Sequence, residues 1–172
     1  MVEVTQALAF MEQQYAQFVA LAHDGRTPYR WQFRLMRYVA QEGRWPDRIS
    51  VPTASGKTSV IDIHVFLNAM VGLAEDESRK EHEILSCLPL RLIPRRLALT
   101  VNRRSLVDDQ FDEADELCGK IHTSESMIHY KEGLKLRAGV HDGLPHTDKP
   151  SVMNVVELRG GLAYQRDWRY YP

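Results

Sequence analysis

Val51-Pro52-Thr53-Ala54-Ser55-Gly56-Lys57-Thr58-Ser59 is the stretch on which the predicted fold depends. The residues that lead into it, 48–51, read Arg-Ile-Ser-Val and predict a short buried strand. The residues after it are rich in β-branched side chains, but Val60, Ile63, Leu67 and Met70 follow helical spacing. A strand, a tight turn and a helix in this order form the context that a phosphate-binding loop requires.

The chemistry of this loop predicts a nucleotide site. Backbone N–H groups around 54–57 would surround the β-phosphate, and the helix that follows adds the positive end of its dipole. Lys57 would reach the β- and γ-phosphates as the catalytic residue, and Thr58 would bind Mg²⁺. The alternative is a chance Gly-Lys-Thr on a surface turn. The predicted nucleotide-binding residues of the loop are Thr53, Ala54, Ser55, Gly56, Lys57, Thr58 and Ser59.

Gln32 lies upstream of this loop, directly after Pro28-Tyr29-Arg30-Trp31. A glutamine amide offers donors and an acceptor that can pair with N6 and N7 of adenine. Tyr29 or Trp31 could stack on the base, although core packing is the commoner role of either ring. A glutamine on a helix is usually only solvated, so the prediction that Gln32 binds adenine depends on the phosphate-binding loop that follows it.

Composition and patterning predict one α/β unit. The chain has 172 residues, of which 44% are hydrophobic and 26% charged. Its net charge of −1 argues against a polybasic nucleic-acid binder but does not forbid a local basic strip. Further predicted strands cover 95–101 and 151–158. Predicted helices cover 4–22, 31–41, the segment after Ser59, the segment from Ser105 as a capping box with Asp108, and 126–138. Strands that alternate with helices imply a parallel sheet.

The compartment is predicted from what the sequence does not contain. Cys87 and Cys118 stand in no metal-binding or Cys-x-x-Cys spacing, and no signal-peptide pattern or apolar run of membrane-spanning length is present. A cytoplasmic protein is expected. The charged run 75–83 is expected to be a solvated loop or frayed helix.

Several motifs together resemble a known family. A small or apolar residue before Pro-Thr-x-x-Gly-Lys-Thr resembles motif I of superfamily 2 helicases, with Val51 in place of the first glycine of the strict phosphate-loop pattern. Gln32 resembles the Q motif of that superfamily. The segment 94–110, PRRLALTVNRRSLVDDQ, is similar to motif Ia of the CRISPR-associated type I helicases, and 157–161, ELRGG, followed by DWRYYP, is similar to their next nucleic-acid motif. PYRWQ and VNRRSLVDDQ most resemble subtype I-G, also called I-U.

This resemblance implies a fold and an activity. It implies an N-terminal helical segment, 1–27, followed by a partial RecA-like ATP-binding domain, 28–172. The complete protein would use ATP and Mg²⁺ to move along single-stranded DNA and unwind it in antiviral interference. Its partners would be single-stranded DNA and possible further members of the system, a surveillance complex and a nuclease domain or subunit.

Five residues are predicted to contact the DNA backbone. Guanidinium groups pair with phosphate oxygens, and glycines let a strand approach backbone N–H groups. Arg103 and Arg104 follow the predicted strand 95–101, and residues 159–161 follow the predicted strand 151–158. Both groups would lie at the sheet edge where parallel α/β proteins place ligands. The alternative is a solvated arginine pair and a plain turn. The predicted residues are Arg103, Arg104, Arg159, Gly160 and Gly161.

The string FDEADEL, 111–117, spells the acid motif of many helicases but does not fit that role. The residues before Asp112 are too acidic for a buried strand, and a helical stripe places the acids toward water. Glu157 ends an apolar segment but has no aspartate before it. The sequence therefore offers no motif II, so we expect the chain to be the first part of a longer motor domain and to be inactive alone.

Two other functions remain open. A small P-loop kinase also carries Ser-Gly-Lys-Thr at a strand-to-helix turn, but it would not depend on Gln32 for ATP affinity. A non-catalytic nucleic-acid-binding remnant of a helicase would bind DNA without nucleotide and without Lys57.

Overall fold

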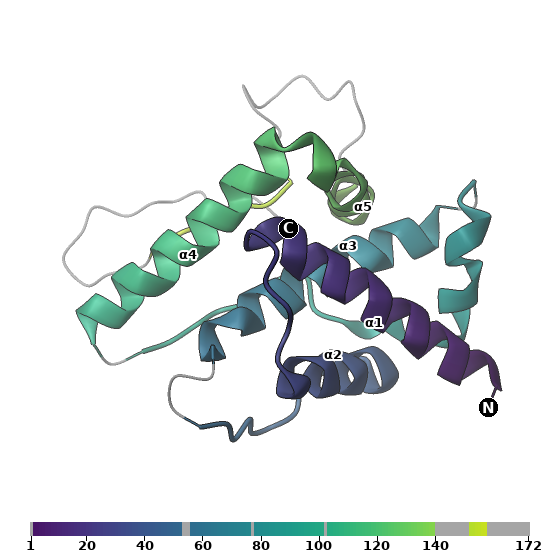
Figure 1. Cartoon of the computed structure of the whole chain (residues 1–172), viewed down its shortest axis with the longest axis horizontal. Helices are drawn as coiled ribbons and strands as arrows, with labels where there is room; N and C mark the ends of the chain where they lie inside the picture. Colours follow the sequence, from purple (N-terminus) through teal and green to yellow (C-terminus); the bar gives the residue numbers. More distant parts are fainter. Residues whose placement is uncertain (1, 53–55, 77, 102, 140–151, 158–172) are drawn as a thin grey trace.

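The computed structural model describes residues 2–52, 56–76, 78–101, 103–139 and 152–157, which form a bundle of helices (Figure 1). The α-helices are α1 (Val2–Ala22), α2 (Arg30–Glu42), α3 (Val60–Glu75), α4 (Arg104–Thr123) and α5 (Ile128–Ala138). The 3₁₀ helices are η1 (Lys57–Ser59), η2 (Lys80–Cys87), η3 (Leu90–Leu92) and η4 (Glu125–Met127). No β-strand occurs among the described residues.

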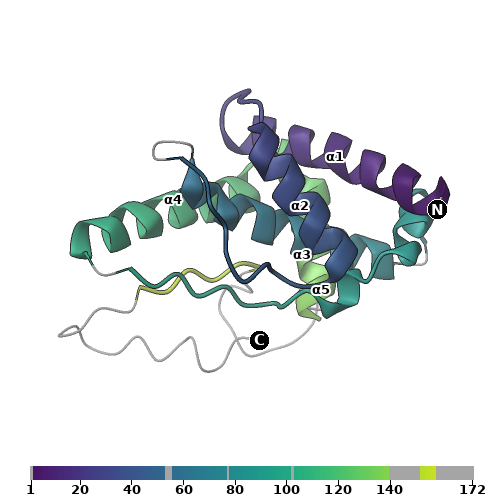
Figure 2. The ribbon, with the colours of Figure 1, turned by 90° about the horizontal axis from the view of Figure 1, so that it is seen from below.

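Helix α3 is the centre of this bundle. Every residue from Ile61 to Leu73 is buried, which requires neighbours on all sides of the helix. Aromatic rings join it to the helices around it: Phe66 packs against Phe18 of α1, with ring centroids 5.7 Å apart, and Phe18 packs edge-on against Tyr130 of α5 at 5.0 Å. In Figure 2, α1 and the extended segments 93–101 and 152–157 lie at opposite edges of the view.

Two glycines allow α3 and α5 to cross in close contact. A Cβ atom added to Gly72 would collide with the carbonyl oxygen of Gly133 and lie 2.8 Å from the backbone nitrogen of Arg137. A Cβ added to Gly133 would collide with the carbonyl oxygen of Ala69 and lie 2.8 Å from Leu73 Cγ. Because the obstacles are largely backbone atoms, they cannot move aside by a change of rotamer.

The central helix also meets the length and composition of a membrane span. The segment Lys57–Glu75 reaches that threshold, and 72% of the window is buried inside the structure. Length and composition do not distinguish the core helix of a bundle from a membrane helix.

The predicted helices are confirmed at each described position. α1, α2, α3 and α5 with η4 lie within a few residues of the predicted bounds. The predicted capping box at Ser105 is wrong, because α4 begins at Arg104 with Arg103 at the N-cap and no side-chain cap bond. The charged run 75–83 is not wholly solvated, since His82 within η2 is buried.

The predicted α/β fold with a parallel sheet, and with it the RecA-like domain, is wrong for the described part of the chain. The predicted strand 95–101 is extended but belongs to no ladder. Side chains of α3 and α5 bond the carbonyls of residues 93–95, just before and at its start. Arg137 donates to Ile93 O at 2.8 Å, and Asn68 donates to Pro94 O at 3.2 Å. A ring nitrogen of His64 lies 3.2 Å from Arg95 O. Helices α3 and α5 thus hold the start of this segment.

The predicted strands 48–51 and 95–101 also differ from strands of a parallel sheet in their exposure. Strands of a parallel sheet are covered on both faces, whereas Ile49 is 38% exposed and Leu99 39% exposed. Residues 152–157 are extended and pack against α4, where Cys118 Sγ lies 3.2 Å from Met153 O. Apolar, β-branched segments of this kind also pack singly on helices, because β propensity depends on the partners that the fold supplies.

Replacing Gly72 by alanine should destabilise the protein by about 3 kcal/mol or more, because the added methyl forces α3 and α5 apart. Urea denaturation followed by circular dichroism measures this change. Gly119→Ala in α4 is the matched control, since no atom lies within 4 Å of its added Cβ. That variant should be more stable by about 0.5–1 kcal/mol, through helix propensity alone. Equal stability of the two variants would contradict the close crossing.

Candidate functional site

The turn Gly56–Ser59 places the predicted phosphate loop directly before the central helix. Gly56 has a φ of 70° at the N-cap of η1, and η1 leads into α3 at Val60. A Cβ on Gly56 would lie 3.2 Å from Ser59 Oγ and 3.4 Å from the ring of Tyr29. Glycine is therefore favoured here both by the left-handed conformation and by the closeness of its neighbours. Thr53, Ala54 and Ser55 lie outside the described residues.

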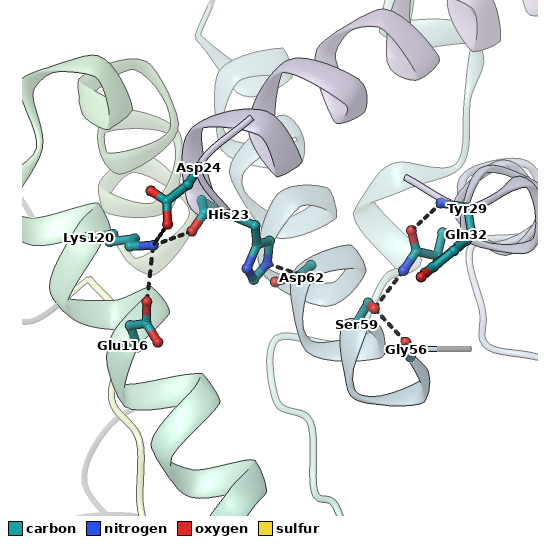
Figure 3. Close-up of polar contacts among 10 residues, drawn as sticks. His23, Asp24, Tyr29, Gln32, Gly56, Ser59, Asp62, Glu116 and Lys120 are labelled. Carbon is teal, nitrogen blue, oxygen red and sulfur yellow. Dashed lines mark hydrogen bonds and ion pairs between the residues drawn. The ribbon is translucent and has the colours of Figure 1, made fainter. Parts of the chain in front are cut away.

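Gln32 is joined to this turn by a chain of hydrogen bonds (Figure 3). The backbone N–H of Tyr29 donates to Gln32 Oε1 at 2.7 Å, and Gln32 Nε2 donates to Ser59 Oγ at 2.6 Å. Ser59 Oγ donates in turn to Gly56 O at 2.5 Å. Two motifs that lie 27 residues apart in the sequence are thus in direct contact.

The same bonds show a structural role for Gln32. It is the third residue of α2 and reaches back to the N–H of Tyr29, which is the glutamine half of a capping box. Its side chain is buried, with 4% of the residue exposed. One amide hydrogen and one lone pair of Oε1 remain beyond these two bonds, so capping does not exhaust the hydrogen-bonding capacity of the amide.

Lys57 lies beside a small hollow next to the turn. The hollow has a volume of about 120 Å³ and is lined by Trp31, Ile49, Val51, Lys57 and Val60. Lys57 itself is exposed and makes no ion pair with a described carboxylate. Pockets that enclose a small ligand usually measure about 300–1,000 Å³, so this hollow matches only part of a nucleotide. It does, however, bring Trp31 beside Lys57.

The predicted Mg²⁺ residue lies in the same turn. Thr58 is the middle residue of η1 and is partly buried. Among the described residues no three His, Cys, Asp or Glu side chains gather in a way that could hold a metal ion. That finding does not bear on Mg²⁺ bound with a nucleotide, because such an ion takes most of its ligands from phosphates and water.

A partly buried ion pair lies one turn further along α3. His23 Nε2 is 3.0 Å from Asp62 Oδ2, and Asp62 is only 7% exposed (Figure 3). The hydrogen bond that the protonated His23 ring donates to Asp62 raises the pKa of His23 above its ordinary value, against the opposing effect of burial. The nearby Tyr15 hydroxyl is buried without a partner among the described residues, and burial together with the charge of Asp62 raises the pKa of Tyr15.

Lys120 of α4 holds the end of α1 that carries His23. Its ammonium group donates to Ala22 O at 2.7 Å and lies 3.0 Å from a carboxylate oxygen of Glu116 and 3.7 Å from one of Asp24. The sequence motifs assign no role to His23 or Asp62. The available signal was an aspartate inside the apolar pattern of α3, since a buried carboxylate requires a partner.

The structure places only part of the predicted DNA-binding set. Arg103 is exposed at the N-cap of α4, and Arg104 is the first residue of that helix. Arg159, Gly160 and Gly161 lie outside the described residues, so the meeting of the two groups remains a prediction. These arginines begin a helix rather than end a strand of a sheet.

The interpretation of FDEADEL as helix is confirmed. Asp112, Glu113 and Asp115 are exposed on α4, while Ala114 and Leu117 of the same string are buried. The acids face solvent because the apolar stripe of an amphipathic helix faces the core.

The pair of His23 and Asp62 should stabilise the protein at acid pH more than at alkaline pH. Because the folded pKa of His23 is raised, the contribution is complete below the unfolded pKa of about 6.5 and is lost as the pH rises through the folded value. The wild type should exceed His23→Gln in free energy of unfolding by about 1–2 kcal/mol at about pH 5.5, and by less at about pH 8.5. Urea denaturation at both pH values measures this difference in free energy of unfolding. In the Asp62→Asn background, the effect of His23→Gln should no longer depend on pH. A difference that grows with pH would contradict the ion pair.

Comparisons of the chain with protein-family models, with curated proteins and with solved structures gave no match. The resemblance to a helicase family therefore depends on the quoted motifs alone. The geometry around Gly56 is the remaining ground on which a function can be argued.

Proposed function

We propose that Gln32 and the turn Gly56–Ser59 bind ATP, as the nucleotide-binding part of an ATP-dependent DNA helicase of CRISPR type I interference. The observation that carries the proposal is the hydrogen-bonded chain from Tyr29 through Gln32 and Ser59 to Gly56. A glutamine on one helix and a Gly-Lys-Thr turn before another need not meet in a bundle of this size. Their contact is expected if both bind the same ligand.

Each residue has a distinct role in this proposal. Backbone N–H groups at the start of η1 and α3 would face the phosphates, where the helix dipole favours negative charge. Lys57 would neutralise phosphate charge, and Thr58 would contribute its hydroxyl to Mg²⁺ that arrives with the nucleotide. Gln32 is 4% exposed, so its remaining N–H and lone pair would reach the adenine edge only after the side chains around it move. The hollow beside Trp31 and Lys57 would admit only part of the nucleotide.

The structural support for this proposal comes from Gln32 and the turn Gly56–Ser59. The described residues supply the start of α3 and the glutamine of α2 but no sheet edge, where parallel α/β proteins place their ligands. For this reason a second candidate also has an observation in its favour. A helicase remnant that binds nucleic acid without nucleotide is consistent with the absence of strands among the described residues and with a hollow of about 120 Å³. A small kinase has no comparable support, because it gives Gln32 no role.

Nucleotide binding is tested by titrating the protein with a fluorescent ATP analogue. Lys57→Ala should weaken the affinity at least about tenfold, because one charge-assisted phosphate contact is removed. Lys80→Ala removes an equally exposed lysine from η2 and should leave the affinity unchanged. If the wild type does not bind, or if the two variants behave alike, the proposal fails in favour of the remnant.

Gln32→Glu tests adenine recognition separately from folding. The substituted carboxylate can still accept the Tyr29 N–H, but it loses the amide donors. The preference for ATP over GTP should fall about tenfold, while the helical content stays unchanged by circular dichroism. An unchanged preference would favour the kinase among nucleotide-binding alternatives.

These 172 residues should not hydrolyse ATP, because the sequence has no apolar strand that ends in Asp-Glu to hold Mg²⁺ and orient water. Phosphate release with and without single-stranded DNA measures this. Turnover that disappears in Lys57→Ala would show that the missing acid motif is supplied by other residues.

A further inference from the structure

A shallow groove runs between α1 and α2 on a side of α2 that Gln32 does not face. It has a volume of about 520 Å³ and is lined by Glu12, Gln13, Arg30, Phe33, Arg34 and Arg37. The three arginines stand at positions i, i+4 and i+7, so they lie one above another on one face of the helix. Gln32 points instead into the core and toward Ser59.

The groove carries more positive than negative charge. Its single described carboxylate, Glu12, pairs with Arg37 at 2.9 Å. Arg30 and Arg34 are exposed and make no ion pair with a described carboxylate. The whole chain has a net charge of −1, so this concentration of arginine is not a consequence of a generally basic composition.

An aromatic ring lies among these arginines. Phe33 is partly buried, and its ring packs edge-on against Tyr15 of α1, with centroids 5.8 Å apart and planes at 87°. This contact fixes the orientation of the ring where it lines the groove. Guanidinium groups beside a fixed aromatic ring combine the two features that proteins use for single strands: pairing with phosphates and stacking on bases.

We infer that this groove binds a single strand of nucleic acid, with Arg30 and Arg34 contacting phosphates and a base stacking on Phe33. An acidic polypeptide would meet the same charges, but a peptide that docks along helices anchors apolar side chains in an apolar pocket. Among the described residues that line this groove, Phe33 is the only one with an apolar side chain. The inference does not depend on the proposed ATP site and adds a surface distinct from Arg103 and Arg104.

Fluorescence anisotropy with a labelled oligothymidine strand of about 20 nucleotides tests the groove. The double variant Arg30→Ala, Arg34→Ala should bind at least about tenfold more weakly than the wild type at about 50 mM salt. Its slope of log affinity against log salt should be smaller by about 1.4, the value for two lost contacts to a single strand. Phe33→Leu keeps an apolar side chain and should lose about tenfold in affinity at an unchanged salt slope.

The matched control is the double variant Lys80→Ala, Arg91→Ala, which removes two exposed positive charges outside the groove. It should bind the strand as the wild type does, and thermal denaturation should show every variant folded. Lys57→Ala should also retain strand binding, so that failure of the ATP proposal and failure of this one are separate results. No binding at low salt, equal loss in the control, or tighter binding of a polyglutamate peptide than of the strand would overturn the inference.

Discussion

The close crossing of α3 and α5 is the contact on which the rest of the structure depends. Gly72 and Gly133 each face backbone of the opposite helix, so the two helices approach more closely than side chains would allow. This crossing covers one side of α3, and the aromatic rings of α1 and α5 cover another. An apolar helix that is enclosed in this way needs no sheet to bury it. The surrounding helices and segments therefore bury α3 without a sheet.

Polar residues on α3 serve the segments that pack around it. Asp62 holds His23 at the end of α1, while His64 and Asn68 bind carbonyls of the extended segment after η3. Buried polar groups are costly without partners, so these pairs define where each segment lies as well as how tightly it packs. The start of the same helix carries the turn at Gly56. The proposed ATP site thus stands at the start of a helix that is buried from Ile61 to Leu73.

Helix α2 connects the two proposed binding surfaces. One side chain, Gln32, contacts the turn before α3, and the arginines at 30, 34 and 37 face the groove against α1. Helical periodicity alone separates these directions, because residues two positions apart point to different faces. On these proposals, nucleotide and nucleic acid would meet different faces of one helix of 13 residues.

Local pattern in the sequence determined the helices, the helical nature of FDEADEL and the turn before α3, because 3.6-residue periodicity and glycine conformations depend on near neighbours. It predicted a sheet wrongly, because an extended apolar segment becomes a strand only if another segment offers its backbone. Here the segment packs beside helices, and Arg137, Asn68 and His64 bond the carbonyls of residues 93–95. Only the tertiary structure decided the contact between Gln32 and Ser59, the burial of Asp62 and the arginine groove. Each of these joins residues far apart in the chain, and their meeting follows from how helices pack rather than from any spacing that the sequence displays.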